Sequence, residues 1–257
     1  PKKDAVPVSE MLELDRWALA RVDALQDRIL ELEQTYQFHL VTSLLMSFAT
    51  EDLGGFYLDV LKDRLYTTKA DGLPRRSAQT ALWHITATLL RLMAPILSFT
   101  AEEAFAVFSP NESGTIFTET NHMVPEVANA PELLAKWEAV RSARAKVLKE
   151  IETLRAEGKI GSSLAADAVI TASGSDWQYL ASLGEELRFV MMTSKCELRK
   201  AEKDDAELTV TVTPSPRTKC IRCWHYVDGT TEDAEHPGLC PRCRVNLFGA
   251  GEKRLYA

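Results

Sequence analysis

The 257-residue sequence has no apolar run of the roughly 18 to 20 residues that a bilayer span requires. Its longest apolar segments, 40–49 and 89–99, are interrupted by Ser, Thr, Arg or Pro. The opening Pro1-Lys2-Lys3-Asp4 leads into polar sequence without the apolar core of a secretory signal. These absences exclude a membrane partner and, with the cysteine spacing below, predict a cytoplasmic protein.

The sequence also has no internal repeat and no low-complexity tract. Hydrophobic residues make up 46% and charged residues 26% of the chain. This ordinary composition excludes a disordered, a collagen-like or a disulfide-stapled protein. The length suits one large or two modest domains.

A basic excess is absent too, because the formal net charge is -7. Phosphate recognition usually leaves a basic footprint, so nucleic acid binding over the whole surface is excluded. The charge is uneven, however: residues 214–257 hold seven Lys and Arg against five Asp and Glu, a balance of +2 that leaves -9 before them. Any site for a polyanion is therefore local.

Apolar residues at helical spacing predict a bundle over residues 1–108. Ser9 is a predicted N-cap, Gly54-Gly55 interrupts the second helix, and Thr100 opens the last helix with a capping box. Residues 109–130, rich in Pro, Asn, Ser and Gly, are predicted to form a surface loop. A long helix over 131–160, ended by Gly158, completes the bundle.

The period changes after Gly161. The runs 168–170 and 208–212 predict strands, with one helix over 175–190 between them, so 161–213 is a small α+β junction domain of three strands. Pro214-Ser215-Pro216 marks a linker into the last segment, 214–257, whose pattern is neither that of a helix nor that of a strand.

The strongest motif is the pair Cys220-x2-Cys223 and Cys240-x2-Cys243, with sixteen residues between the two. This spacing predicts one structural Zn2+ held by four thiolates, with no open position for catalysis. Metal binding is then part of folding for 214–257. Two disulfides, or His225 or His236 in place of one cysteine, are the alternatives, and Cys196 is read as a small buried hydrophobe.

The stretches 56–66 (FYLDVLKDRLY), 75–105 (RRSAQTAL through SFTAEEAF) and 219–246 (KCIRCWHYVDG through CPRCRVN) resemble the C-terminal region of bacterial isoleucyl-tRNA synthetases. The resemblance covers nearly the whole chain. It implies a mainly α fold: the class I synthetase anticodon-binding bundle, then the junction domain and the zinc module. It also implies binding of the anticodon stem-loop of isoleucine tRNA, and nothing in the sequence suggests more than a monomer.

The two signatures that hold ATP in class I synthetases, His-Ile-Gly-His and Lys-Met-Ser-Lys-Ser, are absent. Met192-Thr193-Ser194-Lys195 resembles the second signature only in part, because it lacks the leading lysine. The resemblance therefore implies that ATP, Mg2+, isoleucine activation and aminoacylation belong to upstream domains. We expect no catalytic residue in this sequence and no activity from the chain alone.

Proteins read loop bases by stacking and by edge hydrogen bonds, while Arg and Lys hold phosphates. The predicted tRNA contacts combine these residue types: Arg64, Arg75, Arg76, Arg141, Arg144, Arg222, Trp224, Arg242 and Arg244. Each has a plainer alternative. Arg64 suits an ion pair inside the bundle, Arg141 and Arg144 suit a solvated helix face, and Trp224 suits a cover for the metal site.

Two other functions compete with tRNA recognition. The first is a non-enzymatic scaffold whose zinc module docks a protein. The second is a DNA glycosylase fragment, because the zinc module also resembles the finger of formamidopyrimidine-DNA glycosylases. Those enzymes follow their N-terminal proline with a catalytic glutamate, whereas Lys2 follows Pro1 here, so no DNA binding is expected.

Overall fold

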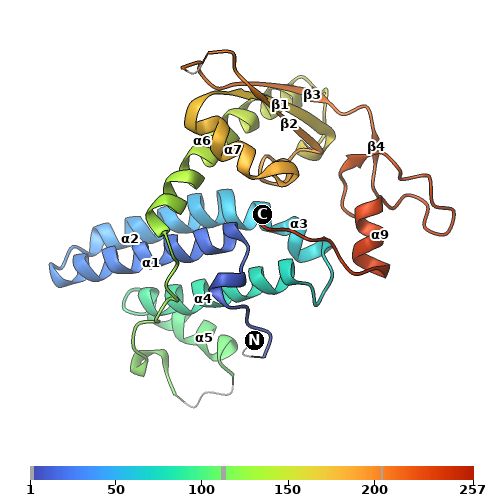
Figure 1. The fold of residues 1–257 in the computed structure, drawn as a ribbon. Coiled ribbons are helices and arrows are strands. Elements are labelled where there is room, and N and C mark those ends of the chain that lie inside the picture. Colours follow the sequence, from blue (N-terminus) through green and yellow to red (C-terminus); the bar gives the residue numbers. More distant parts are fainter. Residues whose placement is uncertain (1–2, 111–113, 204) are drawn as a thin grey trace. The chain divides into compact units, whose positions relative to one another are not determined.

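The computed structural model describes residues 3–110, 114–203 and 205–257. Helices predominate in these ranges, accompanied by a three-stranded and a two-stranded sheet (Figure 1). The predicted mainly α fold with a small α+β part and a four-cysteine cluster is confirmed. Among the helices of these described ranges, none is long and apolar enough to cross a membrane.

The chain forms two compact units. The first unit contains Pro1–Tyr57 and Arg76–Ala130, and the second contains Leu58–Arg75 and Pro131–Ala257. Residues 58–75 thus group with the chain after residue 130 and not with the remaining helices of 1–108. The five segments expected from the sequence stay a prediction.

The first unit is helical. Its main elements are α1 (Glu13–Gln34), α2 (Phe38–Ser47), a π-helical stretch (Phe48–Tyr57), most of α4 (Leu73–Met93) and α5 (Ser98–Phe108). Trp17 of α1 packs edge-on against Phe56, with ring centroids 4.9 Å apart. Buried Asp15 accepts hydrogen bonds from the hydroxyls of Tyr57 and Ser77. Apolar packing and this polar cluster join α1, the π-helical stretch and α4.

Three details of the predicted bundle are wrong. Ser9 lies in a 3-10 turn (Val8–Glu10), and α1 begins at Glu13, since the chain buries Met11 and Leu12 first. Thr100 lies inside α5, which begins at Ser98. Gly54-Gly55 does not end its helix, because the chain widens into the π-helical stretch and continues. A Cβ at Gly54 would lie 3.2 Å from the Ala49 carbonyl oxygen, so the wide turn favours glycine.

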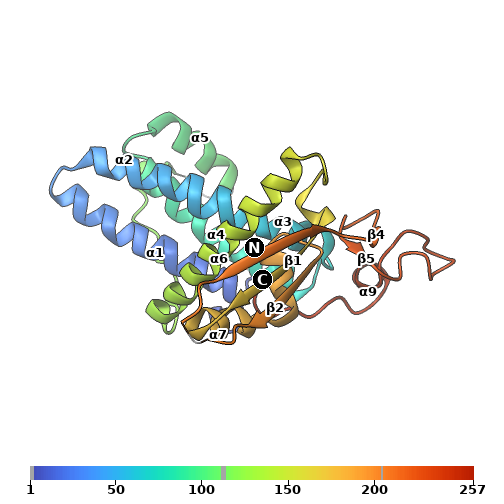
Figure 2. The same ribbon diagram turned by 90° about the horizontal axis from the view of Figure 1, so that it is seen from above.

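The second unit contains α3 (Leu58–Thr67), α6 (Ala130–Ala156) and a sheet of β1 (Ala166–Ala172), β2 (Lys195–Lys200) and β3 (Thr209–Pro214). The strand order is β2-β1-β3, with β1 parallel to β2 and antiparallel to β3. Figure 2 shows α7 (Gly174–Ser182) beside this sheet. The single helix predicted over 175–190 is wrong: it divides into α7 and α8 (Leu187–Val190), because Gly184 takes a φ of 51° between them.

The last segment has more regular structure than its pattern indicates. The strands β4 (Thr218–Lys219) and β5 (Tyr226–Val227) pair, and α9 (Pro241–Phe248) follows. Pro241 occupies the first turn of α9, where its missing N–H costs nothing, and the Cys240 sulfur accepts from the Cys243 N–H. The metal-ligand motif therefore also starts a helix.

Candidate functional site

The four motif cysteines meet in one cluster. All are buried, and their sulfur atoms lie within 4.8 Å of one another. Sγ of Cys220 lies 3.8 Å from Sγ of Cys243, and Sγ of Cys223 lies 3.7 Å from Sγ of Cys240. Tetrahedral zinc with Zn–S bonds of about 2.3 Å places sulfurs about 3.8 Å apart, whereas a disulfide needs about 2.05 Å. The geometry fits a closed structural zinc site and not the disulfide alternative.

The local backbone supports negative charge on these sulfurs. The Cys240 N–H donates to Sγ of Cys220 at 3.3 Å, and the Cys243 N–H donates to Sγ of Cys240 at 3.4 Å. Hydrogen bonds with the thiols of Cys223 and Cys243 lower the pKa of Cys240 to about 3, while hydrogen bonds with Cys223 and Cys240 raise the pKa of Cys243 well above its usual range. A thiolate is the form that binds metal, and Cys240 is the sulfur that this arrangement favours as a thiolate.

Neither alternative histidine belongs to this cluster. His225 places Nδ1 3.2 Å from the Cys223 carbonyl oxygen, and the His236 ring lies against Phe248 with centroids 4.1 Å apart. Val227 and Leu239 are the partly buried hydrophobic residues that pack on the cysteines. So small a core explains why a metal is needed to hold this part of the chain.

Two predicted tRNA contacts beside the cysteines, Arg222 and Arg242, bind residues of α3. Both terminal nitrogens of Arg242 donate to the carboxylate of Asp63 at 2.7 Å, and Arg254 donates to the same carboxylate. Arg222 donates to the carbonyl oxygens of Thr67 at 2.6 Å and Tyr66 at 3.3 Å, at the C-terminal end of α3. These arginines fasten the cysteine module to α3 within the second unit.

Asp63 is the centre of this ionic cluster. Burial opposes its charge, but the hydrogen bond and charge of Arg242 and the charge of Arg254 hold the pKa of the carboxyl well below its usual range. Glu252 adds a second carboxylate, 3.5 Å from Arg242 and 3.2 Å from Arg254. The cluster balances two arginines with two carboxylates.

The other predicted arginines of the second unit also have internal partners. Arg64 is fully buried, and Arg144, 5% exposed, donates to Asp59 at 2.8 Å and to the Val190 carbonyl oxygen at 2.9 Å. We expected Arg144 to lie on a face of α6 that is solvated or binds RNA. The structure shows that Arg144 is packed in the interior. Arg75 donates to the Leu65 carbonyl oxygen, and Arg141 lies 3.8 Å from Glu138.

Arg244 has internal partners too. It donates to the carbonyl oxygens of Gly229 at 3.3 Å and Leu239 at 3.1 Å, and it pairs with Asp233 at 3.3 Å. Its guanidinium therefore connects three residues of the long loop between the two cysteine pairs and stabilises that loop.

Trp224 differs from these arginines because its side chain is 60% exposed. Lys219 Nζ lies 5.1 Å from its ring centroid. Trp224 lines a cavity of about 520 Å³ in the second unit. Tyr66, which is 74% exposed, lines this cavity too. The contacts predicted from the sequence do not include Tyr66, although it is an aromatic residue at a polar helix end.

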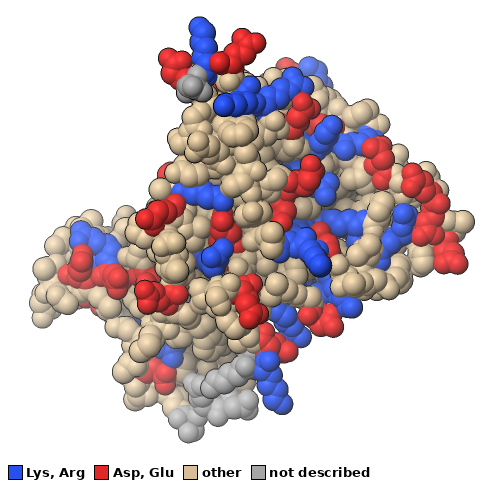
Figure 3. All heavy atoms as spheres, in the orientation of Figure 1, with Lys and Arg blue, Asp and Glu red and all other residues tan. Residues whose placement is uncertain are grey.

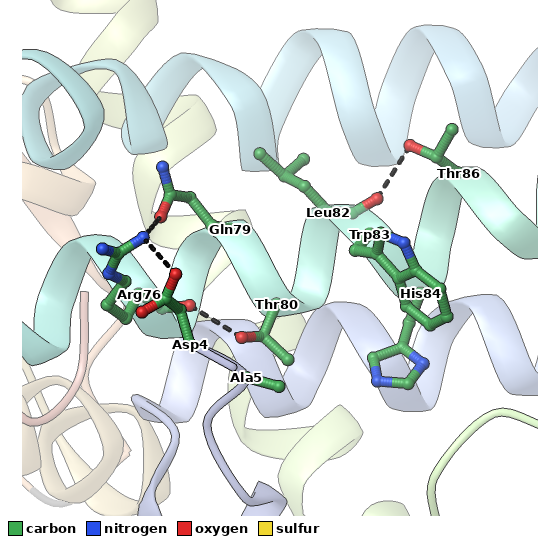
Figure 4. A pocket seen from close by; sticks show the side chains of 9 residues that line it. All are labelled: Asp4, Ala5, Arg76, Gln79, Thr80, Leu82, Trp83, His84 and Thr86. Carbon is green, nitrogen blue, oxygen red and sulfur yellow. Dashed lines mark hydrogen bonds and ion pairs between the residues drawn. The ribbon is translucent and has the colours of Figure 1, made fainter. Parts of the chain in front are cut away.

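Arg76 belongs to the first unit, where it lines a separate cavity of about 620 Å³ along α4 (Figure 4). It lies 3.4 Å from the Asp4 carboxylate and donates to Gln79 at 3.2 Å. His84 also lines this cavity, and its Nδ1 is 2.9 Å from Nε2 of His122. Burial and then His122 lower the pKa of His84 to about 4, so its ring is neutral at pH 7.

The charges on one face of the molecule are mixed in sign. On the face shown in Figure 3, Lys and Arg side chains are interspersed with Asp and Glu, with no broad field of one sign. This face therefore has no extended basic surface.

The family model "Anticodon-binding domain of tRNA ligase" matches residues 15–170, more than half of the chain. The chain belongs to this family of anticodon-binding domains. The model "Zinc finger found in FPG and IleRS" matches residues 218–245, the segment with the four cysteines. This second match and the sulfur geometry together support a structural zinc in this anticodon-binding protein.

Individual relatives agree with the family. The chain is 51% identical over 255 residues to an isoleucine–tRNA ligase of Azoarcus sp. (strain BH72) and 53% identical over 258 residues to that of Janthinobacterium sp. (strain Marseille). Each alignment covers 99% of this chain and 27% of the relative's length. The resemblance to isoleucyl-tRNA synthetases is thereby confirmed, and the chain spans about a quarter of the length of these relatives.

Proposed function

We propose that this chain is the tRNA-recognition part of an isoleucine–tRNA ligase and binds the anticodon stem-loop of isoleucine tRNA as a monomer in the cytoplasm. The observation that carries the proposal is the combination, on one chain, of the anticodon-binding match over 15–170 and the four-cysteine module that follows it. Activation of isoleucine with ATP and Mg2+, and aminoacylation, are then the work of other domains of the ligase.

The predicted contact residues divide into two roles under this proposal. Trp224 stacks on a loop base, because its ring is exposed and planar. Arg75, Arg76, Arg141 and Arg244, which are partly exposed, hold phosphates in addition to their internal contacts. Arg64, Arg144, Arg222 and Arg242 are positioning residues, since their hydrogen bonds or burial tie them to the protein.

Zinc has a structural role in this proposal. Cys220, Cys223, Cys240 and Cys243 hold it, and the closed thiolate set leaves no position for substrate. The metal keeps Trp224 in place, because that residue directly follows the ligand Cys223.

The test is binding of the zinc-loaded chain to isoleucine tRNA and to the same tRNA with an exchanged anticodon, at two salt concentrations and with or without a chelator. We expect preference for the native anticodon, a steep loss of affinity with salt and a loss on chelation. Equal affinity for both tRNAs would contradict anticodon recognition. An absence of binding would favour the protein-docking scaffold.

A further inference from the structure

Three arginines surround the buried ring of Phe189 in the second unit. The guanidinium carbons of Arg254, Arg242 and Arg188 lie 3.6, 5.0 and 4.7 Å from the ring centroid. An aromatic ring attracts each cation, but the three guanidinium groups repel one another. Three positive charges at one buried ring therefore need negative charge nearby.

Two of these arginines are matched by carboxylates. Asp63 accepts hydrogen bonds from Arg242 and from Arg254. Glu252 lies 3.5 Å from Arg242 and 3.2 Å from Arg254. Two carboxylates thus balance two guanidinium groups, and the charge of Arg188 is left over.

Arg188, on α8, has no acidic partner of its own. Its guanidinium makes no hydrogen bond and no ion pair with the residues that the structure describes. Glu186, two residues earlier, uses its carboxylate to accept the backbone N–H groups of residues 255–257 at 2.8 to 2.9 Å. Glu185 is exposed and forms no ion pair within the described ranges. The protein therefore supplies no direct counter-ion for this third arginine.

The Arg188 side chain is half-buried and open on one side. Its Nε is among the buried polar atoms of the described residues that make no hydrogen bond, whereas its two terminal nitrogens are not. These terminal nitrogens are therefore in contact with solvent. Burial and then the charges of Arg242 and Arg254 lower the pKa of Arg188, and a bound anion would offset the repulsion.

We infer that Arg188 binds a phosphate group and that, in the complex with tRNA, this group belongs to the RNA backbone. A guanidinium presents a planar fork of N–H donors that matches phosphate oxygens, and one phosphate supplies the negative charge that the cluster lacks. The inference rests on the proposed function for the source of the phosphate, because free phosphate has the same chemistry.

The first test is the salt dependence of tRNA binding by Arg188→Gln. This variant removes the charge and keeps a polar side chain. Its affinity for isoleucine tRNA should fall about tenfold, and the slope of log affinity against log salt should be shallower by about 1, as for one lost phosphate contact. A backbone phosphate carries no sequence information, so tRNA with an exchanged anticodon should lose affinity by about the same factor.

The matched control is Arg199→Gln, which removes the same charge from an exposed arginine of β2 that pairs with Glu197 at 2.7 Å. Its affinity and salt slope should stay near those of the unaltered chain. Arg188→Lys keeps the charge and should restore most of the salt slope. Equal slopes for Arg188→Lys and Arg188→Gln would contradict a phosphate contact.

Unfolding of the free, zinc-loaded chains separates ligand binding from a structural role. In urea, Arg188→Gln should keep the midpoint of the unaltered chain or raise it, because repulsion by Arg242 and Arg254 is relieved. Zinc content should be unchanged. A lower midpoint together with unchanged tRNA affinity would make Arg188 a structural residue and overturn the inference.

Inorganic phosphate probes the same site without RNA. At matched ionic strength, replacing chloride with phosphate should raise the unfolding temperature of the unaltered chain more than that of Arg188→Gln. If phosphate distinguishes the two chains but tRNA does not, the site takes free phosphate and the backbone assignment is overturned.

The two proposals can fail separately. If the unaltered chain binds tRNA but neither tRNA nor phosphate distinguishes it from Arg188→Gln, the phosphate site is overturned and the proposed function stands. If the unaltered chain binds no tRNA, the proposed function is overturned, and the comparison in inorganic phosphate alone decides the site.

Discussion

The helical first unit and the cysteine module of the second unit are stabilised in opposite ways. The first unit buries many apolar side chains, among them Trp17, Phe56 and Ile85, and adds polar contacts such as the cluster around Asp15. The module has four cysteines with Val227 and Leu239 as its core, and a few arginines as its attachments. Stability spread over many contacts tolerates a single loss, whereas stability concentrated in a few groups does not.

The largest effect expected is that of removing a metal ligand. Cys240→Ser should abolish stoichiometric zinc binding and unfold residues 218–248, because zinc contributes roughly 10 to 16 kcal/mol in small zinc domains. Zinc analysis and limited proteolysis measure this, while far-UV circular dichroism should keep most of its helical signal. The matched control is Cys196→Ser, at a thiol on β2 whose pKa burial raises to about 12, which should leave zinc content unchanged. A collapse of all helicity in Cys240→Ser would contradict the contrast between the two regions.

The second largest effect is expected at Asp63. Asp63→Asn leaves Arg242 and Arg254 without their shared carboxylate, and losing one partner of a buried charge cluster costs about 3 to 5 kcal/mol. Urea unfolding at pH 7 measures the loss, with exposed Asp71→Asn as the control.

The pH dependence of that loss has a definite sign. Because the folded pKa of Asp63 is depressed, its contribution is fully present above the unfolded pKa of about 3.9 and is lost as the pH falls further. The difference between the unaltered chain and Asp63→Asn should therefore be constant from pH 5 to 8, values chosen to lie above this pKa. A difference that already shrank between those values would mean that Asp63 is not held ionised.

A smaller effect is expected in the first unit as the pH falls. Burial depresses the pKa values of His84 and His122, so both rings are favoured in the neutral form. This contribution is present above the unfolded pKa of about 6.5 and is lost as the pH falls toward 4; partial exposure reduces it to about 1 kcal/mol. Thermal unfolding followed by the helical signal should show this slope, and His84→Gln should flatten it. An unchanged slope in the variant would assign the effect to other groups.

The smallest effect on stability is expected at Trp224. Trp224→Ala removes a ring that is 60% exposed, so the free energy of unfolding should change by no more than about 0.5 kcal/mol. Affinity for the anticodon stem-loop should nevertheless fall about tenfold or more, as for the loss of a stacking platform. Fluorescence anisotropy with a labelled hairpin measures it, and Leu255→Ala, at another exposed apolar side chain, is the control. Equal affinity of Trp224→Ala and the control would leave Trp224 without an RNA role.

The same contrast between local and concentrated interactions explains which features could be predicted from the sequence. Apolar periodicity located most helices of the first unit, since the period of a helix is a local property. It failed at Ser9, Thr100 and Gly184, where backbone geometry and contacts with distant residues decide the helix ends. The cysteine cluster was predictable because both pairs and their separation obey the reach of one metal ion.

By itself, the sequence determined the helical class, the α+β junction and the four cysteines, because these depend on short-range periodicity and ligand spacing. Only the tertiary structure showed which protein groups the arginines contact, since these groups are remote in sequence: Asp63 is 179 residues from Arg242, and Asp59 is 85 residues from Arg144. A guanidinium can bind a carboxylate inside the protein or a phosphate of RNA, and the residue type alone does not show which of the two it binds.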